Sequence, residues 1–415
     1  MKFAGIDWAT DRHFVALEAA DGQALDEWSV EHTPAAIAGL LVRLQQEGGP
    51  GEVVVGVESG APLVTDQLLL AGYTVYALNP KQADRFRDRY APAGSKDDRR
   101  DALVIADAVR TDAGRLKPLE SDSPLTEELR MRDRARTRLV EQRTRHSNQL
   151  RQVLSRYYPA LLELERAMHD PFLAALLRAY PDPDGGRGAR LPRLRRLLEE
   201  HRIRTIDAEA LQRLLHRPGF AVPRHVLAAC RDEALDLVAQ IELLVEQTRL
   251  ADRRLRELFE GHPDRELLES LPGLGTCLAI RVCAELGDYR ARTADATTLQ
   301  AFAGTAPVTR RSGKRGVSSI TMRRGCNRVL QAALFHMARC SVHRSPWARA
   351  YLRHLRGRGV PHAKAVRALS NKWAKIIAAV LRTRRRYDEV THVERLLRNQ
   401  VPWALGLDHP HQEAA

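Results

Sequence analysis

Two acidic side chains follow apolar segments near the start of the sequence, in positions where a carboxylate can bind a metal ion. Asp7 comes directly after the apolar residues 3–6, and Glu58 comes directly after the apolar residues 53–57. An ionised carboxylate next to such a segment is unfavourable unless a partner stabilises it. If a helical crossover makes the two segments parallel neighbours, both acids lie at the edge of the sheet where α/β proteins bind ligands.

A second pair of acids, Asp98 and Asp101, is spaced three residues apart on an expected helix and therefore shares one helical face. Four converging oxygen donors suit Mg²⁺, and two such ions support phosphodiester chemistry. Each acid also has a structural alternative. Asp98 would form a capping box with Ser95, and Asp101 would be an exposed helical acid. Asp97 competes with both as a ligand.

Alternating strands and helices in the first hundred residues must position these acids. Strands are expected at Phe3–Trp8, His13–Ala19, Ala24–Val30, Val53–Glu58 and Thr74–Leu78. Helices are expected after the Thr33-Pro34 cap and over Pro62–Ala71. Three strands in a meander, followed by alternating helices and strands, is the order of the ribonuclease-H-like fold. Several other mixed α/β folds share that order.

The length of 415 residues and the 44% hydrophobic share predict two or three globular domains. We expect an α/β domain over 1–118, a helical coiled-coil region over 119–262, a mostly α-helical C-terminal domain over 263–388, and a tail over 389–415. Apolar residues repeat at heptad spacing from Leu237 to Leu258. The partner of this heptad face is either another subunit or the earlier helix of this chain, through Leu139, Leu150, Leu154 and Tyr157.

Charge is concentrated in the C-terminal third. The chain carries a formal net charge of +14, and between Ala301 and Tyr387 it has 21 Lys and Arg residues and no Asp or Glu. Codon usage can enrich arginine, but it cannot remove every acid from a segment of that length. The alternative interpretation, a basic face that only contacts solvent, would not exclude acids from the intervening helices. The segment therefore predicts contact with nucleic acid.

Cysteine usage and hydropathy indicate the compartment. The five cysteines form no C-x-x-C pair, which favours reduced thiols in a cytoplasm. The sequence has no apolar stretch long enough for a membrane span, and its N-terminus enters a strand-like segment without a signal peptide. We expect a cytoplasmic protein associated with nucleic acid and not with a membrane.

Ser312 lies among Arg310, Arg311, Lys314 and Arg315, next to Gly313. A serine in a basic, glycine-containing loop is either a phosphate contact or a nucleophile. No neighbouring histidine could act as its base, so a nucleophilic serine would depend on a metal ion.

Two further patterns are weaker indications of a functional site. Residues 272–275 (Pro-Gly-Leu-Gly) fit either a phosphate-holding hairpin or a turn that ends a helix. His336, Cys340 and His343 share a helical face. They have no compelling fourth ligand, which favours packing over zinc binding.

Taken together, these motifs resemble an insertion-sequence transposase family, the IS-one-ten and IS-eleven-eleven group. At the N-terminus the resemblance rests on Gly-Ile-Asp around Asp7, the glycine-flanked Glu58, and Lys-x-Asp-x-x-Asp-Ala over 96–102. In the C-terminal half the family's motifs occur in its order over residues 271–275, 284–288, 302–307, 311–313 and 325–330. Trp8 and Asp97 depart from the family pattern, and neither removes one of the four acids.

The resemblance implies a RuvC-like domain in which Asp7, Glu58, Asp98 and Asp101 hold Mg²⁺. It also implies that Ser312 is a nucleophile that forms a phosphoserine–DNA intermediate. Family members are recombinases guided by a bridge RNA, and they act on donor and target DNA as homo-tetramers (dimers of dimers). Nucleic-acid contacts are expected from the basic and glycine residues around Ser312 and from the segment after them: Arg310, Arg311, Gly313, Lys314, Arg315, Arg323, Arg324 and Arg328.

Two other functions fit the same residues. One is a RuvC-like Holliday-junction nuclease, or another metal-dependent nuclease, that uses water instead of serine. The other is a non-catalytic nucleic-acid-binding scaffold in which the acids are structural.

Overall fold

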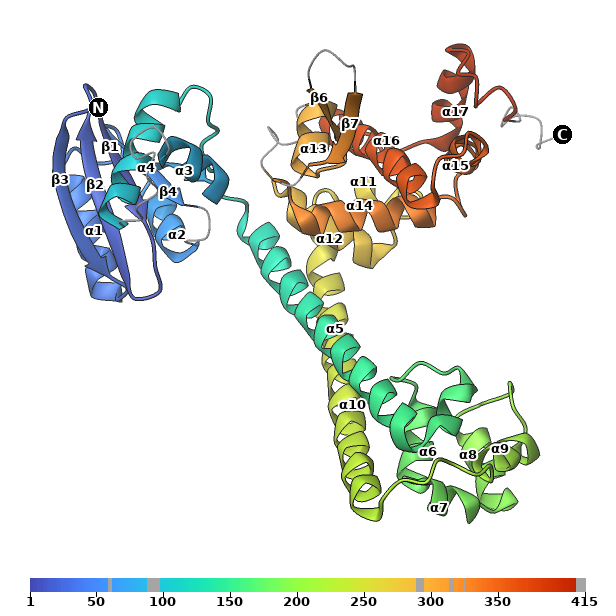
Figure 1. Ribbon diagram of the computed structural model, residues 1–415. Helices are drawn as coiled ribbons and strands as arrows, with labels where there is room; N and C mark the ends of the chain where they lie inside the picture. The colour runs from blue at the N-terminus through green and yellow to red at the C-terminus, as the bar shows by residue number, and fades with distance from the viewer. Residues whose placement is uncertain (59–61, 88–97, 289–294, 313–316, 324, 408–415) are drawn as a thin grey trace. The chain divides into compact units, whose positions relative to one another are not determined.

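The computed structural model describes residues 1–58, 62–87, 98–288, 295–312, 317–323 and 325–407. The chain divides into two compact units, Met1–Ser121 and Asp122–Ala415 (Figure 1). Within the described ranges, no helix combines the length and the apolar character that a membrane span requires.

The first unit is built on a five-stranded sheet with the strand order β3-β2-β1-β4-β5. The strands are β1 (Lys2–Asp7), β2 (Arg12–Ala19), β3 (Ala24–Glu31), β4 (Val53–Glu58) and β5 (Thr74–Leu78). The first three strands pair antiparallel, whereas β1 with β4 and β4 with β5 pair parallel. All five expected strands are therefore confirmed to within about two residues. Their pairing is a meander followed by parallel strands, as the ribonuclease-H-like order requires.

Four described helices accompany this sheet: α1 (Pro34–Gln46), α2 (Pro62–Leu70), α3 (Pro80–Arg87) and α4 (Asp98–Asp112). Thr33 caps α1 as expected, because its side chain accepts a hydrogen bond from the Ala36 N–H at 3.2 Å. Alternate residues of β1 and β4, such as Ile6 and Val55, share a buried core with Leu40 of α1. The opposite face of the same strands carries Gly5 and Gly56 and packs against α4.

The second unit begins with two long helices, α5 (Pro124–Tyr157) and α10 (Arg224–Glu260), which lie side by side in opposite directions (Figure 1). Leu150, Leu154 and Tyr157 of α5 share a buried cluster with Leu237 and Ile241 of α10. Two partners were considered for the heptad face, and in the structure this face packs against the earlier helix of the same chain. Four of the short helices between them complete that cluster: η1 (Pro159–Leu164), α6 (Pro171–Ala179), α8 (Leu191–Glu200) and α9 (Ala208–Leu215). The short helix α7 (Pro183–Arg187) lies between α6 and α8 in the sequence.

A second large core holds the C-terminal part together, around the buried rings of Trp347 and Trp373. The elements of this C-terminal part are α11 (Arg265–Glu269), α12 (Thr276–Leu286), α13 (Ala296–Phe302), β6 (Pro307–Ser312), β7 (Val317–Met322), α14 (Arg328–Ser341), α15 (Pro346–Gly357), α16 (His362–Thr383) and α17 (Glu389–Arg398).

Two expectations for this part are corrected. The C-terminal domain over 263–388 was expected to be mostly α-helical, with no strand in it, but β6 and β7 form an antiparallel hairpin within it. The segment 389–415 was expected to be a tail, but Asp388 caps α17, which adds buried Val393 to the core. Trp403 lies 5.0 Å from the ring of Tyr351. Favourable capping and apolar burial therefore keep at least residues 389–403 in the folded domain.

Candidate functional site

Three of the four predicted acids meet at one end of the first unit. Asp7, Asp98 and Asp101 each offer a carboxylate oxygen, and these oxygens all lie within 4.8 Å of one another. Asp101 is only 4% exposed, whereas Asp98 is exposed at the first turn of α4. Asp97 and Ser95 lie outside the described residues, so the capping-box alternative and the role of Asp97 stay as expectations.

The register of the sheet explains why Asp7 faces α4. Side chains alternate between the two faces of a strand, so Asp7 lies on the same face as Gly5, against which α4 packs. By the same alternation Glu58 shares its face with Gly56. Because β1 and β4 run parallel, with Ile6 opposite Val57, Asp7 and Glu58 leave the sheet at the same edge. Glu58 is not part of the group of three carboxylates.

Arg87 at the end of α3 also contacts this site, and sequence reasoning did not identify it. Its Nε donates to Asp101 Oδ1 at 2.6 Å, and its Nη1 donates to Asp84 at 2.7 Å. The hydrogen bond to Asp101 raises the pKa of Arg87 above its ordinary value, despite the opposing effect of burial. The buried carboxylate of Asp101 is thus already paired with one cation.

The donor set fits a hard divalent cation. All three converging groups are carboxylates, and one of them is buried beside a guanidinium that compensates its charge. Mg²⁺ prefers oxygen ligands, and it retains water where the protein supplies few of them. Asp7, Asp98 and Asp101 could hold such an ion, and Glu58 is a further acid on the same sheet edge.

Two glycines let α4 approach the sheet closely enough to bring the acids together. A Cβ atom on Gly5 would lie 2.0 Å from the carbonyl oxygen of Ala102 and 2.5 Å from the amide nitrogen of Ala106. A Cβ on Gly56 would lie 2.6 Å from a methyl group of Val109. Ala102 directly follows Asp101, so contact at Gly5 fixes the depth at which this acid sits.

We therefore predict that Gly5→Ala weakens metal binding without altering any ligand. The added methyl group meets backbone atoms, so α4 must shift away from β1 and separate Asp98 and Asp101 from Asp7. A displacement of about 1 Å can lower a catalysed rate about 100-fold, and the overpacking itself destabilises the fold by about 1–3 kcal/mol. Titration calorimetry with Mg²⁺ measures the loss of affinity.

Gly39→Ala is the matched control, because Gly39 lies in α1 of the same unit and a Cβ there meets nothing within 4 Å. It should bind Mg²⁺ as the parent does. Thermal unfolding of both variants separates loss of the site from loss of the fold. Parental metal affinity in folded Gly5→Ala would show that the close approach of α4 does not position the acids.

The predicted nucleophile Ser312 is the last residue of β6, and its backbone pairs with Val317 of β7. Arg310 and Arg311 precede it in the same strand. Gly313, Lys314, Arg315 and Arg324 lie outside the described residues. Arg323 and Arg328 are exposed, as nucleic-acid contacts would need to be. The structure thus places Ser312 at the end of a strand in a two-stranded antiparallel sheet within the acid-free segment.

Buried polar groups connect the family-like motifs of the C-terminal half. Glu285, 2% exposed, accepts hydrogen bonds from Arg134 of α5 at 2.9 and 3.0 Å. It also accepts one at 2.7 Å from Asn327, which caps α14. Burial disfavours the ionised form of Glu285, but these hydrogen bonds outweigh it and lower its pKa. This motif therefore joins three helices, and Glu285 is a structural acid.

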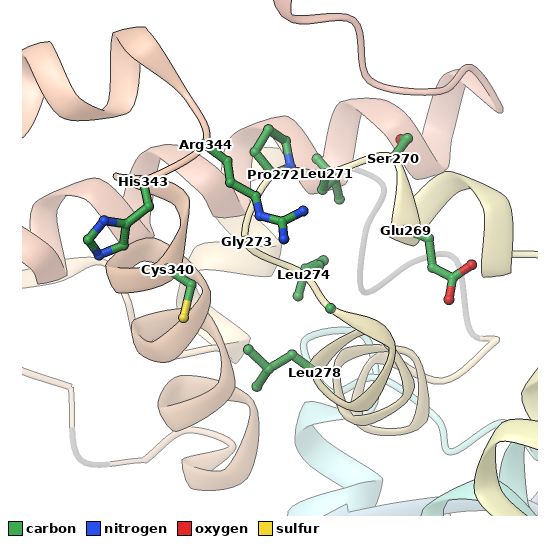
Figure 2. A pocket seen from close by; sticks show the side chains of 11 residues that line it. Glu269, Ser270, Leu271, Pro272, Gly273, Leu274, Leu278, Cys340, His343 and Arg344 are labelled. Atoms are coloured by element: carbon green, nitrogen blue, oxygen red, sulfur yellow. The ribbon is translucent and has the colours of Figure 1, made fainter. Parts of the chain in front are cut away.

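The Pro-Gly-Leu-Gly segment packs closely on α14. Gly273 has a φ of +88°, and a Cβ there would lie 2.6 Å from both the Met337 carbonyl oxygen and the Ser341 nitrogen. Figure 2 shows the adjoining cavity of about 690 Å³, with the side chain of Arg344 directed toward this loop. Close packing accounts for Gly273 without a bound phosphate.

His336, Cys340 and His343, for which packing was favoured over zinc binding, are not among the metal-binding groups found in the described residues. A different group does converge: His262, Asp264 and Cys283, all buried. His262 Nδ1 accepts the Asp264 N–H at 3.1 Å, and its Nε2 lies 3.0 Å from the Thr126 hydroxyl. Asp264 pairs with Arg384. These contacts tie the end of α10 to α5 and α16, so we interpret the group as structural.

Comparisons with known proteins identify the class as a transposase. Residues 4–159 match the family model of the DEDD transposase domain of IS110, described as "Transposase". Residues 265–353 match the model described as "Transposase IS116/IS110/IS902 family". The first match includes the three converging carboxylates, and the second includes Ser312 and the first part of the acid-free segment.

Full-length relatives extend this result. A protein of the IS117 mini-circle of Streptomyces coelicolor, whose name assigns it as a transposase, is 33% identical over 93% of this chain and 95% of its own length. An uncharacterized 42 kDa protein of the insertion element IS900 of Mycobacterium paratuberculosis is 29% identical over 94% and 98%. The chain belongs to the IS110 family of insertion-sequence transposases.

A solved structure of T. thermophilus RuvC in complex with a Holliday junction substrate was also found, at 21% identity and a TM-score of 0.23. The match covers 29% of this chain and 99% of the RuvC chain.

Proposed function

We propose that this transposase is a Mg²⁺-dependent DNA recombinase that cleaves and exchanges strands through Ser312. The observation that carries the proposal is the convergence of Asp7, Asp98 and Asp101 at the sheet edge that also bears Glu58. When bound there, Mg²⁺ would supply positive charge for a scissile phosphate and its reacting oxygens. Asp7, Asp98, Asp101 and Glu58 would hold and orient the ion, and Arg87, which pairs with Asp101, would balance part of their charge.

Ser312 would make the covalent link to DNA. In the first step its hydroxyl oxygen bonds to the phosphorus, while the bond from phosphorus to one DNA oxygen breaks. The serine proton passes to a base or to solvent, and the departing oxygen takes up a proton as a DNA hydroxyl. In the second step a hydroxyl oxygen of another DNA strand bonds to the phosphorus, while the bond from phosphorus to the serine oxygen breaks. The attacking hydroxyl gives up its proton to a base or to solvent, and the serine oxygen takes up a proton, which regenerates the serine. Arg310 and Arg311 would supply positive charge beside the phosphate.

The partners in this proposal are donor DNA, target DNA and a bridge RNA. The acid-free segment from Ala301 to Tyr387 supports a polyanionic partner. We further propose a homo-tetramer (a dimer of dimers) in which the acids of one subunit serve the Ser312 of another. The site of action would be the nucleoid in a prokaryotic cytoplasm.

Product analysis tests this function against its alternatives. The transposase and its RNA are incubated with Mg²⁺ and two DNA duplexes that carry different end labels, and the products are separated under denaturing conditions. Rejoined strands that carry both labels support recombination. Free nicked ends without rejoining would support a RuvC-like nuclease that uses water, and uncut DNA would support a scaffold.

A further inference from the structure

Helix α16 lines a cavity of about 420 Å³ with positively charged side chains. The wall also contains Tyr351 of α15 and one residue from each strand of the hairpin, Pro307 of β6 and Thr321 of β7. None of the described residues that line the cavity is acidic. Four cations enter it from successive turns of α16: Lys364, Arg367, Lys372 and Lys375. Mutual repulsion among cations in one concavity is relieved by an anion bound between them.

Lys372 is the cation whose surroundings point most clearly to an anion. It is half-buried, and its ammonium nitrogen lies 4.7 Å from the ring centroid of Tyr351 and 5.6 Å from that of Trp403. Within the described parts of the chain, no carboxylate forms an ion pair with it. Burial, and then the charge of Lys375, lowers its pKa. The two rings hold the ammonium in place, but they do not neutralise it.

An adjoining cavity of about 360 Å³ continues the basic surface. It shares Thr305 and Arg367 with the first cavity and extends to Arg328 and His336 of α14. We name the two cavities together the α16 groove. A small anion would engage one or two cations, whereas cations distributed along a groove match the regularly repeated charge of a phosphodiester backbone.

The position of the α16 groove relative to Ser312 favours the DNA strand that is cut as the occupant of the groove. Strand β6 begins at the groove with Pro307 and ends at Ser312. Its six residues span roughly 17 Å, which is about five base-pair steps of a duplex. We infer that the α16 groove binds the phosphodiester backbone of the DNA strand about five nucleotides from the linkage that Ser312 attacks. The DNA partner and the distance to the cut rest on the proposed function.

Salt-dependent DNA binding tests the α16 groove. The probe is a fluorescein-labelled DNA duplex, and its anisotropy is measured over a series of NaCl concentrations in EDTA, so that no cleavage is needed. Lys364→Gln combined with Lys375→Gln should weaken binding about tenfold and lower the log–log salt slope by about 2. Lys372→Gln should lower the slope by about 1. Because Lys364 and Lys375 are exposed, the double variant should unfold at the parental temperature.

Lys117→Gln is the matched control, an exposed lysine in the first unit that should leave the slope unchanged. The inference is overturned if the double variant keeps the parental slope, or if the parent does not bind the duplex. An unlabelled RNA hairpin, added as competitor, distinguishes the nucleic acids. Loss of RNA binding with parental DNA binding would assign the groove to RNA and contradict the inference.

The outcome is separable from that of the proposed function. A parent that shows no strand exchange, but whose DNA affinity depends on these lysines, would retain the groove and refute the recombinase mechanism. Strand exchange by the parent together with an unchanged slope in the double variant would refute the groove alone.

Discussion

Asp7→Asn is expected to reduce DNA strand cleavage about 1,000-fold, equivalent to about 4 kcal/mol of transition-state stabilisation. The substitution preserves the size of the side chain but removes one of three negative charges whose oxygens lie within 4.8 Å of one another. A divalent cation bound by the remaining acids would lose both affinity and its fixed position. Cleavage of end-labelled DNA in Mg²⁺, quantified on denaturing gels, measures the effect.

Asp112→Asn is the control for this substitution. Asp112 ends α4, the helix that begins with Asp98. Its Oδ1 lies 3.3 Å from Nη1 of Arg115, whose side chain is highly exposed. A pair with one highly exposed partner contributes about 0–1 kcal/mol, so cleavage should continue at the parental rate. Parental cleavage by Asp7→Asn would show that the carboxylate group is not the catalytic metal site.

Ser312→Ala is expected to abolish the covalent protein–DNA adduct completely. The alanine side chain has no oxygen with which to bond the phosphorus, whereas the basic residues around it remain available for phosphate contact. DNA binding should therefore change by less than about threefold. The adduct is detected by its reduced mobility on a denaturing protein gel after incubation with labelled DNA and Mg²⁺.

A serine in the same hairpin provides the matched control. Ser319 lies in β7, where its backbone pairs with Arg310, and Ser319→Ala should form the adduct at the parental level. Persistence of the adduct in Ser312→Ala would assign the nucleophile to another residue. Loss of the adduct in both variants, together with weaker DNA binding, would indicate that the hairpin binds DNA and that Ser312 is not its nucleophile.

The sheet and its acids were predictable from local patterns. Short apolar segments ended by Asp7 and Glu58, with a capped helix between them, predict parallel neighbours because a crossover must return the chain to the same sheet. The structure has this pairing. The convergence of Asp98 and Asp101 with Asp7 depends on the close packing of α4 at Gly5 and Gly56. Each glycine alone would fit a turn, a bulge or a close approach equally well.

Other features depend on tertiary contacts that local periodicity does not contain. Arg87 reaches Asp101 from a different helix, and no spacing in the sequence relates the two. The hairpin was missed although residues 317–321 contain β-branched side chains, because helical segments and basic residues surround it. Helix α17 was missed despite the capping residue Asp388, because its burial depends on contacts with distant parts of the domain.

Titration calorimetry with Mg²⁺ tests the central claim most directly, using the parent, Asp7→Ala and Glu58→Ala under identical conditions. The account predicts a saturable binding signal in the parent, its loss in Asp7→Ala, and a weaker signal in Glu58→Ala, with all three proteins folded by circular dichroism. Equal Mg²⁺ affinity in the three proteins would contradict it and would leave these acids as structural residues of a nucleic-acid-binding scaffold.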